Sequence, residues 1–298
     1  MTKTMTCYLM GGLGNQLFQL FATISYAIKT QSKFIFTNAK TLGGNGNTMR
    51  YTYWETFLKR LKPFLREQMD YSRMEMIKES SFEYNDLYET LSSCIDRNTN
   101  HTILLFGYFQ SYQYFQDNKD AILRMIGLDS IKTELLKKMN VDETYWKTTV
   151  SLHFRIGDYK QLQDFHPIMK IEYYLKSLQK ICEKTNQDTW NILYFCEEKD
   201  VDDVNRAILI LKQQYTNCHF MKVNANLQDW EQMVLMSCCH HNIIANSTFS
   251  WWGAYLNTWE DKIVCYPSIW FGKKLNHDTK DLCPEEWNKI DINVYSPG

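Results

Sequence analysis

The segment TVSLHFRIGDY, at residues 149–159, indicates the fold, because it is an apolar strand that ends in a polar loop. From there to residue 266, strand-like and helix-like stretches alternate regularly. Units of this kind predict a parallel sheet with helices on both faces, as in doubly wound domains of the nucleotide-binding type. We expect strands at 149–154, 190–196, 218–223, 242–245 and 262–266, and helices at 171–183, 201–213, 230–240 and 249–258.

The first half of the chain begins in the same way and becomes less regular. We expect strands at 7–10, 33–36 and 103–109, helices at 17–29, 111–126 and 131–139, a tight loop at 11–15 and a mobile loop at 38–47. Since 298 residues suggest about two domains, the fold class is predicted to be α/β with two Rossmann-like domains. The crossing between them is placed at 141–147, which divides the chain into residues 1–147 and 148–298.

The composition excludes some classes of function. With 33 Lys and Arg against 34 Asp and Glu, the net charge of −1 gives no electrostatic reason to bind long nucleic acid. The nine cysteines include no C-x-x-C pair and most lie in apolar runs, which predicts buried free thiols and a cytoplasmic location. Neither a targeting segment nor a stretch apolar enough to cross a membrane is visible.

Open α/β sheets bind ligands beyond the carboxyl ends of their strands. Two such sheets are expected to face each other across a cleft lined by these loops. The loops of interest therefore follow Met10, Phe154, Cys196 and Ala245.

The first of these loops is GGLGNQ, at residues 11–16, which opens directly into a helix. Its glycines, Gly12 among them, permit close approach of a ligand, and the helix N-terminus offers N–H groups and partial positive charge. Asn15 and Gln16 add amide groups suited to hydroxyl recognition. The loop matches neither G-x-G-x-x-G nor the P-loop pattern. The alternative is a glycine turn that only connects strand to helix.

The second loop contains His153, Arg155 and Asp158 at the end of a predicted strand. Alternation places His153 and Arg155 on one face of the strand. An arginine fork can grip two phosphate oxygens at once. Asp158 is expected to fix the guanidinium or to bind a ribose hydroxyl. The alternative is a structural Arg–Asp pair beside a buried histidine.

The third loop is ANSTFSWWG, at residues 245–253, between a buried strand and a helix. Ser247 or Thr248 is expected to cap the helix, which leaves other hydroxyl and N–H groups for an anion. The candidate binding residues are Asn246, Ser247, Thr248, Phe249 and Ser250. The alternative is a cap followed by a buried pair, Trp251 and Trp252.

Three further patterns carry acidic or metal-ligating residues. Glu197 is expected to accept from the N–H groups on the edge of a guanine base. Alternatively, it is an acid that is stabilised by the dipole of the helix that follows it. The D-x-D pattern at 200–202, which holds a metal in many nucleotide-sugar enzymes, lies at a helix start and is interpreted as a cap. The run CCHH at 238–241 is placed on a helix, where adjacent side chains point about 100° apart and cannot form one tetrahedral site. No metal site is predicted.

Four motifs in this order resemble the α-1,2-fucosyltransferases in their short soluble form. They are GGLGNQLFQ at 11–19, GYFQSYQYF at 107–115, HFRIGDY at 153–159 and HHNIIANSTFSWWGAYL at 240–256. The family usually has two adjacent arginines in the third motif, whereas here Ile156 follows Arg155. Since an H-x-R-I-G form occurs in the wider fucosyltransferase superfamily, the change bears on acceptor and linkage more than on the donor.

The resemblance implies a B-type glycosyltransferase fold, with the acceptor on the 1–147 side and a GDP-sugar in the 148–298 domain. It implies inverting transfer of L-fucose from GDP-β-L-fucose to the 2-hydroxyl of a galactoside, without a metal or another cofactor. Two alternatives stay open. One is transfer from another nucleotide sugar or to another position, and the other is a catalytically silent sugar-binding protein.

The expected chemistry centres on the charge that grows on the GDP leaving group. Arg155 and the helix N-termini are expected to stabilise that charge, with Ser247, Thr248 and Ser250 as hydrogen-bond donors. The base that takes the acceptor proton is open between the side chains of His153, Asp158, Glu197 and Glu198 and the departing phosphate. Asn15 and Gln16 are expected to orient the acceptor or the fucose.

Overall fold

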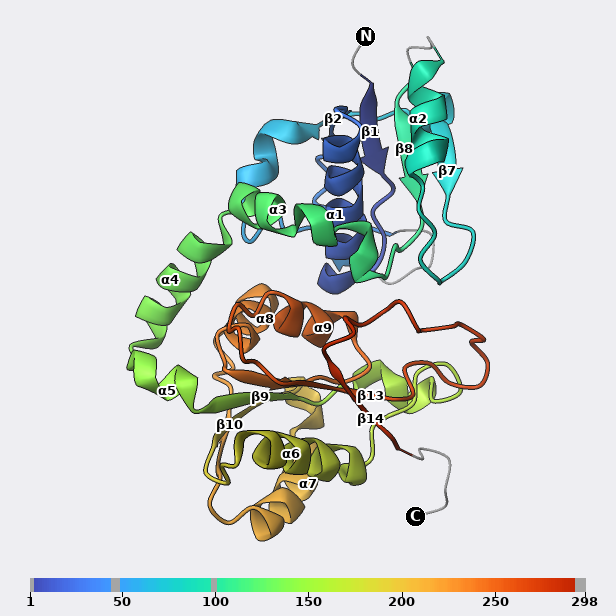
Figure 1. The fold of residues 1–298 in the computed structure, drawn as a ribbon. Coiled ribbons are helices and arrows are strands. Elements are labelled where there is room, and N and C mark those ends of the chain that lie inside the picture. The colour runs from blue at the N-terminus through green and yellow to red at the C-terminus, as the bar shows by residue number, and fades with distance from the viewer. Residues whose placement is uncertain (1–2, 44–48, 98–100, 293–298) are drawn as a thin grey trace. The chain divides into compact units, whose positions relative to one another are not determined.

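A computed structural model of the chain describes residues 3–43, 49–97 and 101–292. Part of the loop predicted at 38–47 lies outside these residues. The chain forms two compact units (Figure 1), of which unit 1 is Met1–Ile131 with His277–Pro284 and unit 2 is Lys132–Asn276 with Glu285–Gly298. The division falls within helix α4 (Leu128–Met139). The domain boundary at residues 147 and 148 stays a prediction.

Unit 2 is built on a six-stranded parallel sheet with the strand order β11-β10-β9-β12-β13-β14. In chain order this is 3-2-1-4-5-6, the doubly wound arrangement whose ligands bind where the order reverses. The reversal lies at β9 and its neighbour β12, so the loops after these strands take the ligand position. The strands are β9 (Thr149–His153), β10 (Asn191–Phe195), β11 (His219–Lys222), β12 (His241–Ile243), β13 (Val264–Pro267) and β14 (Asn288–Ile290).

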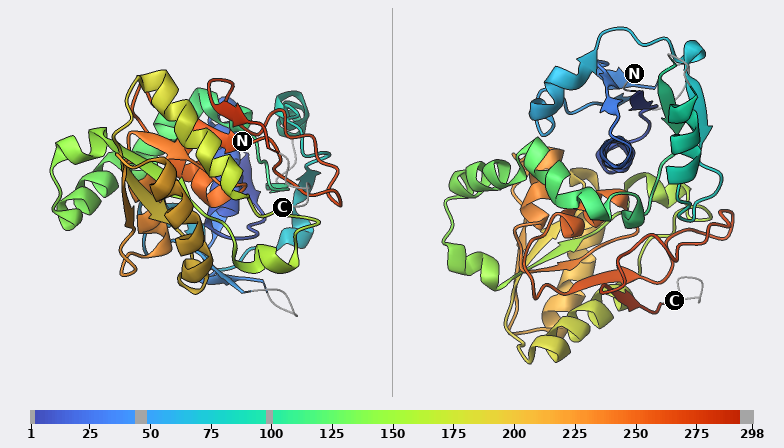
Figure 2. Two further views of the ribbon diagram at one scale, coloured as in Figure 1. Left: turned by 90° about the horizontal axis from the view of Figure 1, so that it is seen from below. Right: turned by 45° about the horizontal axis from the view of Figure 1, so that its top comes forward.

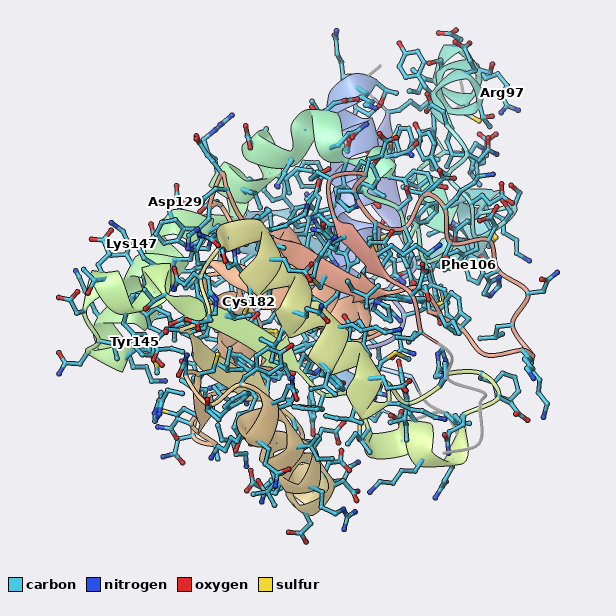
Figure 3. All side chains as sticks on the ribbon, turned by 60° about the horizontal axis from the view of Figure 1, so that its bottom comes forward. Arg97, Phe106, Asp129, Tyr145, Lys147 and Cys182 are labelled. Carbon is cyan, nitrogen blue, oxygen red and sulfur yellow. The ribbon has the colours of Figure 1, made fainter. Side chains whose placement is uncertain are left out.

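Helices cover both faces of this sheet, as Figure 1 shows. One face carries α6 (Ile171–Thr185) and α7 (Val201–Gln214), and the other carries α8 (Asp229–Met236) and α9 (Thr248–Tyr255). Apolar residues at helical spacing on α6, including Leu178 and Ile181, are fully buried against strand residues such as Val150 and Leu152. Figure 3 shows Cys182 on α6 and Tyr145 and Lys147 on α5 (Glu143–Lys147).

Unit 1 is built on a four-stranded parallel sheet with the strand order β2-β1-β8-β7. Helix α1 (Leu13–Lys29) packs against β1 and β2 and is buried along almost its whole length; the right view of Figure 2 shows it end-on. The strands are β1 (Thr4–Cys7), β2 (Lys33–Phe34), β7 (Glu75–Lys78) and β8 (Ile103–Phe106). The prediction of an α/β chain with two parallel sheets is therefore confirmed. Their arrangement across a cleft stays a prediction.

Smaller elements complete the two units. The strand pairs are β3 (Phe36–Thr37) with β6 (Leu65–Arg66) and β4 (Thr41–Leu42) with β5 (Arg50–Tyr51). The remaining α-helices are α2 (Tyr88–Asp96) and α3 (Lys119–Ile126). The 3-10 turns are η1 (Lys59–Phe64), η2 (Tyr71–Arg73), η3 (Tyr112–Tyr114), η4 (Gln116–Asn118), η5 (Gly157–Gln161) and η6 (Glu198–Asp200).

Several predicted boundaries are wrong. The first strand is 4–7 rather than 7–10, because the β-branched Thr4 and Thr6 pair with neighbouring strands. Helix α1 begins at Leu13 rather than 17, since Gly12 acts as its N-cap. The strand predicted to reach Phe109 ends at Phe106, labelled in Figure 3. Instead of one helix at 111–126, two 3-10 turns precede α3. Strand β14 has no counterpart in the sequence prediction.

Candidate functional site

The loops after β9, β10 and β12 lie together at the carboxyl ends of the strands of the unit 2 sheet. In the strand register, His153 lies opposite Phe195 on one side, and Leu152 lies opposite Ile243 on the other. The three loops therefore leave the sheet at the same level. These are three of the four loops expected from the sequence, and they carry Arg155, Glu197 and Asn246.

Arg155 is the centre of an ionic cluster formed by two of these loops. Its Nη1 donates to Glu197 and its Nη2 donates to Asp158 at 2.5 Å. Glu197 also pairs with Lys199 at 2.8 Å. The Arg155 side chain keeps 23% exposure, and a guanidinium has five N–H donors, so the fork can also take an anion from solvent. The contact of Arg155 with Asp158 is one of the two expected roles of that aspartate.

A buried carboxylate fixes the loop that carries Arg155. Asp200, 2% exposed, accepts from the N–H of Gly157 at 2.7 Å and lies 3.4 Å from Nζ of Lys160. Gly157 has a φ of +35°, and a Cβ there would lie 2.8 Å from Oε1 of Glu197. Asp200 occupies the N-cap position of α7, as the D-x-D interpretation predicted, but its side chain makes no cap hydrogen bond and instead holds this loop. Sequence reasoning missed this link, since the two residues are 43 positions apart.

The run CCHH at 238–241, which contains residue types that bind metals, also has structural partners. Helix α8 ends at Met236, so Cys238 and Cys239 follow it, and the prediction that the run lies on a helix is wrong. His240 contacts the carbonyl oxygen of Lys147 and the carboxylate of Asp261. Among residues 3–43, 49–97 and 101–292, no group of three or more His, Cys, Asp or Glu side chains is placed to hold a metal ion.

His153 lies beside this cluster, at the end of β9. It is 8% exposed, and its Nδ1 is buried without a hydrogen-bond partner among the described residues. Its ring lies 5.6 Å from that of Phe249, which places β9 and α9 residues together. Burial, followed by the charge of Arg155, lowers the pKa of His153 to about 3. A neutral imidazole with so low a pKa is a poor proton acceptor.

The buried histidines predict a loss of stability in mild acid. Burial lowers the pKa of His241 to about 3 as well, and that residue is 1% exposed. Because both folded-state values lie below the ordinary 6.5, the unfolded chain binds more protons below that pH. Stability is therefore complete above about pH 6.5 and falls towards pH 3, by about 2 kcal/mol per histidine at pH 5.

Urea unfolding at pH 7 and pH 5 measures this loss. The variants His153→Gln and His241→Gln are each expected to flatten the dependence by removing one contribution. Equal pH dependence in both variants and in the parent chain would contradict the assignment.

In the loop after β12, some polar side chains bond to the backbone and others are partly exposed. Ser247 caps α9 and accepts from the N–H of Phe249, which confirms one of the two predicted caps. Ser250 is fully buried, and its hydroxyl donates to the carbonyl oxygens of Ala245 and Ser247. Thr248 and Phe249 are half-buried. The half-buried pair is therefore better placed to meet a ligand than Ser250.

Asn246 is almost fully buried, and its side chain has a role within the fold. Its Nδ2 donates to the carbonyl oxygens of Pro167 and Trp270, at 3.0 and 3.1 Å. Its Oδ1 is buried without a partner among the described residues. The pair Trp251 and Trp252 is fully buried, as expected.

In unit 1, the predicted glycine loop is held by glutamines. Gly11 has a φ of +75°. Gln16, 1% exposed, donates through Nε2 to the carbonyl oxygens of Gly11 and Tyr51. Gln19 accepts from the N–H of Met10 at 2.9 Å. Gln16 therefore fixes the loop backbone, and its role towards a ligand stays a prediction.

The other two predicted residues of this loop are more accessible. Gly12 and Asn15 are half-buried, and Oδ1 of Asn15 accepts from Gln110 at 3.2 Å. Both residues lie at the N-terminal end of α1. They belong to unit 1, whereas the other candidate residues form their cluster in unit 2.

The chain is similar to known glycosyltransferases over almost its whole length. The family model described as "Glycosyl transferase family 11" matches residues 1–291. The Escherichia coli "O-antigen biosynthesis glycosyltransferase WbnK" is 30% identical, over 94% of this chain and 98% of the relative. The E. coli "Alpha-1,2-colitosyltransferase" is 26% identical, over 95% of this chain and 97% of the relative.

Among solved structures, a mutant of Arabidopsis thaliana FUT1 in complex with GDP is similar with a TM-score of 0.49 and 10% identity, covering 89% of this chain and 70% of that one. The E. coli ADP-heptose heptosyltransferase II is similar with a TM-score of 0.49 and 11% identity, covering 97% of this chain and 90% of that one. Within the described residues, no helix is both long and apolar enough to cross a membrane.

Proposed function

The chain belongs to glycosyl transferase family 11, and from this premise we propose that it transfers L-fucose from GDP-β-L-fucose to a sugar hydroxyl. Transfer inverts the anomeric centre, and the proposed acceptor position is the 2-hydroxyl of a galactoside, which gives an α-1,2-fucoside. The observation that carries the proposal is the position of Arg155, a half-buried guanidinium directly after the strand at which the sheet order reverses.

The proposed chemistry places negative charge beside that guanidinium. The acceptor oxygen forms a bond to the anomeric carbon, and the bond between that carbon and the phosphate oxygen breaks with its electron pair on GDP. Charge that grows in the transition state is what a fixed cation stabilises best. The N-terminus of α9, beside Thr248, adds the partial positive charge of a helix. The acceptor proton passes to a carboxylate of the cluster rather than to His153.

The test should include GDP-colitose as a second donor, because one relative is named a colitosyltransferase. Colitose is fucose without its 3-hydroxyl, so the two donors share the nucleotide and differ by one polar group. A site with a hydrogen-bond partner for that hydroxyl discriminates strongly between them, since the partner is otherwise left unpaired.

The test measures GDP release from GDP-fucose and from GDP-colitose, with and without lactose, and identifies the product linkage by NMR. Acceptor-dependent release from GDP-fucose and an α-1,2-linked product are expected. GDP release from GDP-colitose but not from GDP-fucose would identify colitose as the transferred sugar. Calorimetry with GDP, UDP and ADP accompanies this assay, and a preference for UDP would contradict the donor assignment. Sugar binding without any release would indicate a silent binding protein.

A further inference from the structure

Tyr159 contacts Arg155 and ties together the two loops that flank the strand reversal. The guanidinium carbon of Arg155 lies 4.9 Å from the centre of the Tyr159 ring, within the range of a cation–π contact. The Tyr159 hydroxyl donates to the main-chain carbonyl oxygen of Asn246 at 3.1 Å. One side chain therefore connects the loop after β9 to the loop after β12.

The Tyr159 ring also packs against a neighbouring aromatic side chain. His166 stacks on it at 4.9 Å with an interplanar angle of 19°, and Phe271 contacts His166 at 5.7 Å. A half-buried aromatic ring held by a neighbouring ring and by a hydroxyl bond has little rotational freedom. It presents a fixed surface to the guanidinium.

A fixed Arg155 matters because this chain has one arginine at the position where the family resemblance leads one to expect two. The following residue, Ile156, is half-buried and packs against the apolar core of unit 2. Asp158 and Glu197 accept from N–H groups of the guanidinium, whereas the guanidinium carbon lies over the Tyr159 ring. When phosphate oxygens compete with the two carboxylates for these N–H groups, the contact with the Tyr159 ring can persist.

We propose that Tyr159 is a positioning residue that holds the Arg155 fork in the orientation that binds the diphosphate of the donor. The inference rests on the proposed function. It assigns to this tyrosine a role that acts through Arg155, so its removal should matter only while the arginine fork is present. The motif HFRIGDY includes the tyrosine, but the sequence alone assigns no role to it or to its stacking partner His166, since one aromatic residue in a polar loop carries no periodic signal.

The test compares Tyr159→Phe, Tyr159→Leu and Arg155→Lys, with the double variant of the last two. Tyr159→Leu removes the ring and is expected to lower kcat/KM and the affinity for GDP by about thirtyfold or less. Tyr159→Phe keeps the ring and is expected to lose about threefold or less. In the Arg155→Lys background, Tyr159→Leu should cost little more, because the fork it positions is gone.

Tyr215→Phe is the matched control, since its hydroxyl also donates to a main-chain carbonyl, that of Leu175, at 2.7 Å in unit 2. Equal losses in the Phe and Leu variants, or losses that multiply in the double variant, would overturn the positioning role. If the Leu variant does not fold, a Phe variant as impaired as Arg155→Lys would overturn it as well.

Binding measurements with GDP, UDP and ADP distinguish a failure of the proposed donor from a failure of the proposed role of Tyr159. A parent chain that binds UDP but not GDP refutes the donor assignment, and the coupling of Tyr159 to Arg155 is then measured with UDP. A parent chain that binds GDP with no effect of Tyr159→Leu refutes the positioning role alone. Absence of binding to GDP, UDP and ADP refutes both.

Discussion

Arg155→Lys is expected to lower kcat/KM by about a hundredfold to a thousandfold while the chain stays folded. Losses of this size follow when one preorganised donor is removed from a charge that grows in the transition state. Lysine keeps the positive charge, but it is a compact point charge and cannot replace the planar fork that contacts two oxygens at once. The change therefore tests geometry rather than charge.

The fold should tolerate this substitution. Both carboxylate partners of Arg155 are well exposed, at 47% for the Asp158 side chain and 41% for that of Glu197. Pairs with exposed partners contribute about 1 kcal/mol or less to stability. A melting curve close to that of the parent chain is expected, with GDP affinity reduced.

The matched control is Arg206→Lys, which alters an exposed arginine of unit 2 whose partner is Asp203 on α7. This variant should keep both its transfer rate and its stability. Near-normal turnover in Arg155→Lys would show that no bidentate grip is needed, and the proposed role of the arginine would fail.

The architecture of unit 2 could be predicted because its elements carry strong periodic patterns. On α6, Tyr174, Leu178 and Ile181 recur at helical spacing and are buried together. The loops after Phe154, Cys196 and Ala245 follow from such strand ends, and three candidate residues of these loops, Arg155, Asp158 and Glu197, lie in direct contact.

The parts that could not be predicted depend on partners distant in the sequence. Asp200 looks like a helix cap until Gly157, on another loop, supplies its donor. Gln16 looks like a ligand-binding amide until the carbonyl oxygen of Tyr51 accepts its N–H. A sequence shows that a polar side chain lies in a loop, but it does not show which backbone group competes for that side chain.

Asn246→Ala is expected to destabilise the chain by about 2 to 5 kcal/mol, because it leaves two buried carbonyl oxygens without their donor. Those oxygens belong to Pro167 and Trp270, and both bonds are buried. Asn246→Asp should cost at least as much at neutral pH, since a carboxylate has no proton to donate and repels both carbonyls. The pKa of this carboxyl would be raised in the fold, so the loss of stability relative to the parent chain should become smaller as the pH falls.

Urea unfolding with GDP titration decides between this structural role and the ligand contact expected from the sequence. Asn288→Ala is the matched control, because among the described residues that side chain donates to a single carbonyl, that of Val264, and a loss of about 1 kcal/mol is expected. A stable Asn246→Ala variant with much weaker GDP binding would return this amide to the ligand. A large loss of stability that exceeds the loss of Asn288→Ala, with GDP affinity kept in the folded fraction, would assign it to the fold, where its two bonds hold the chain segments beside the loop that carries Thr248.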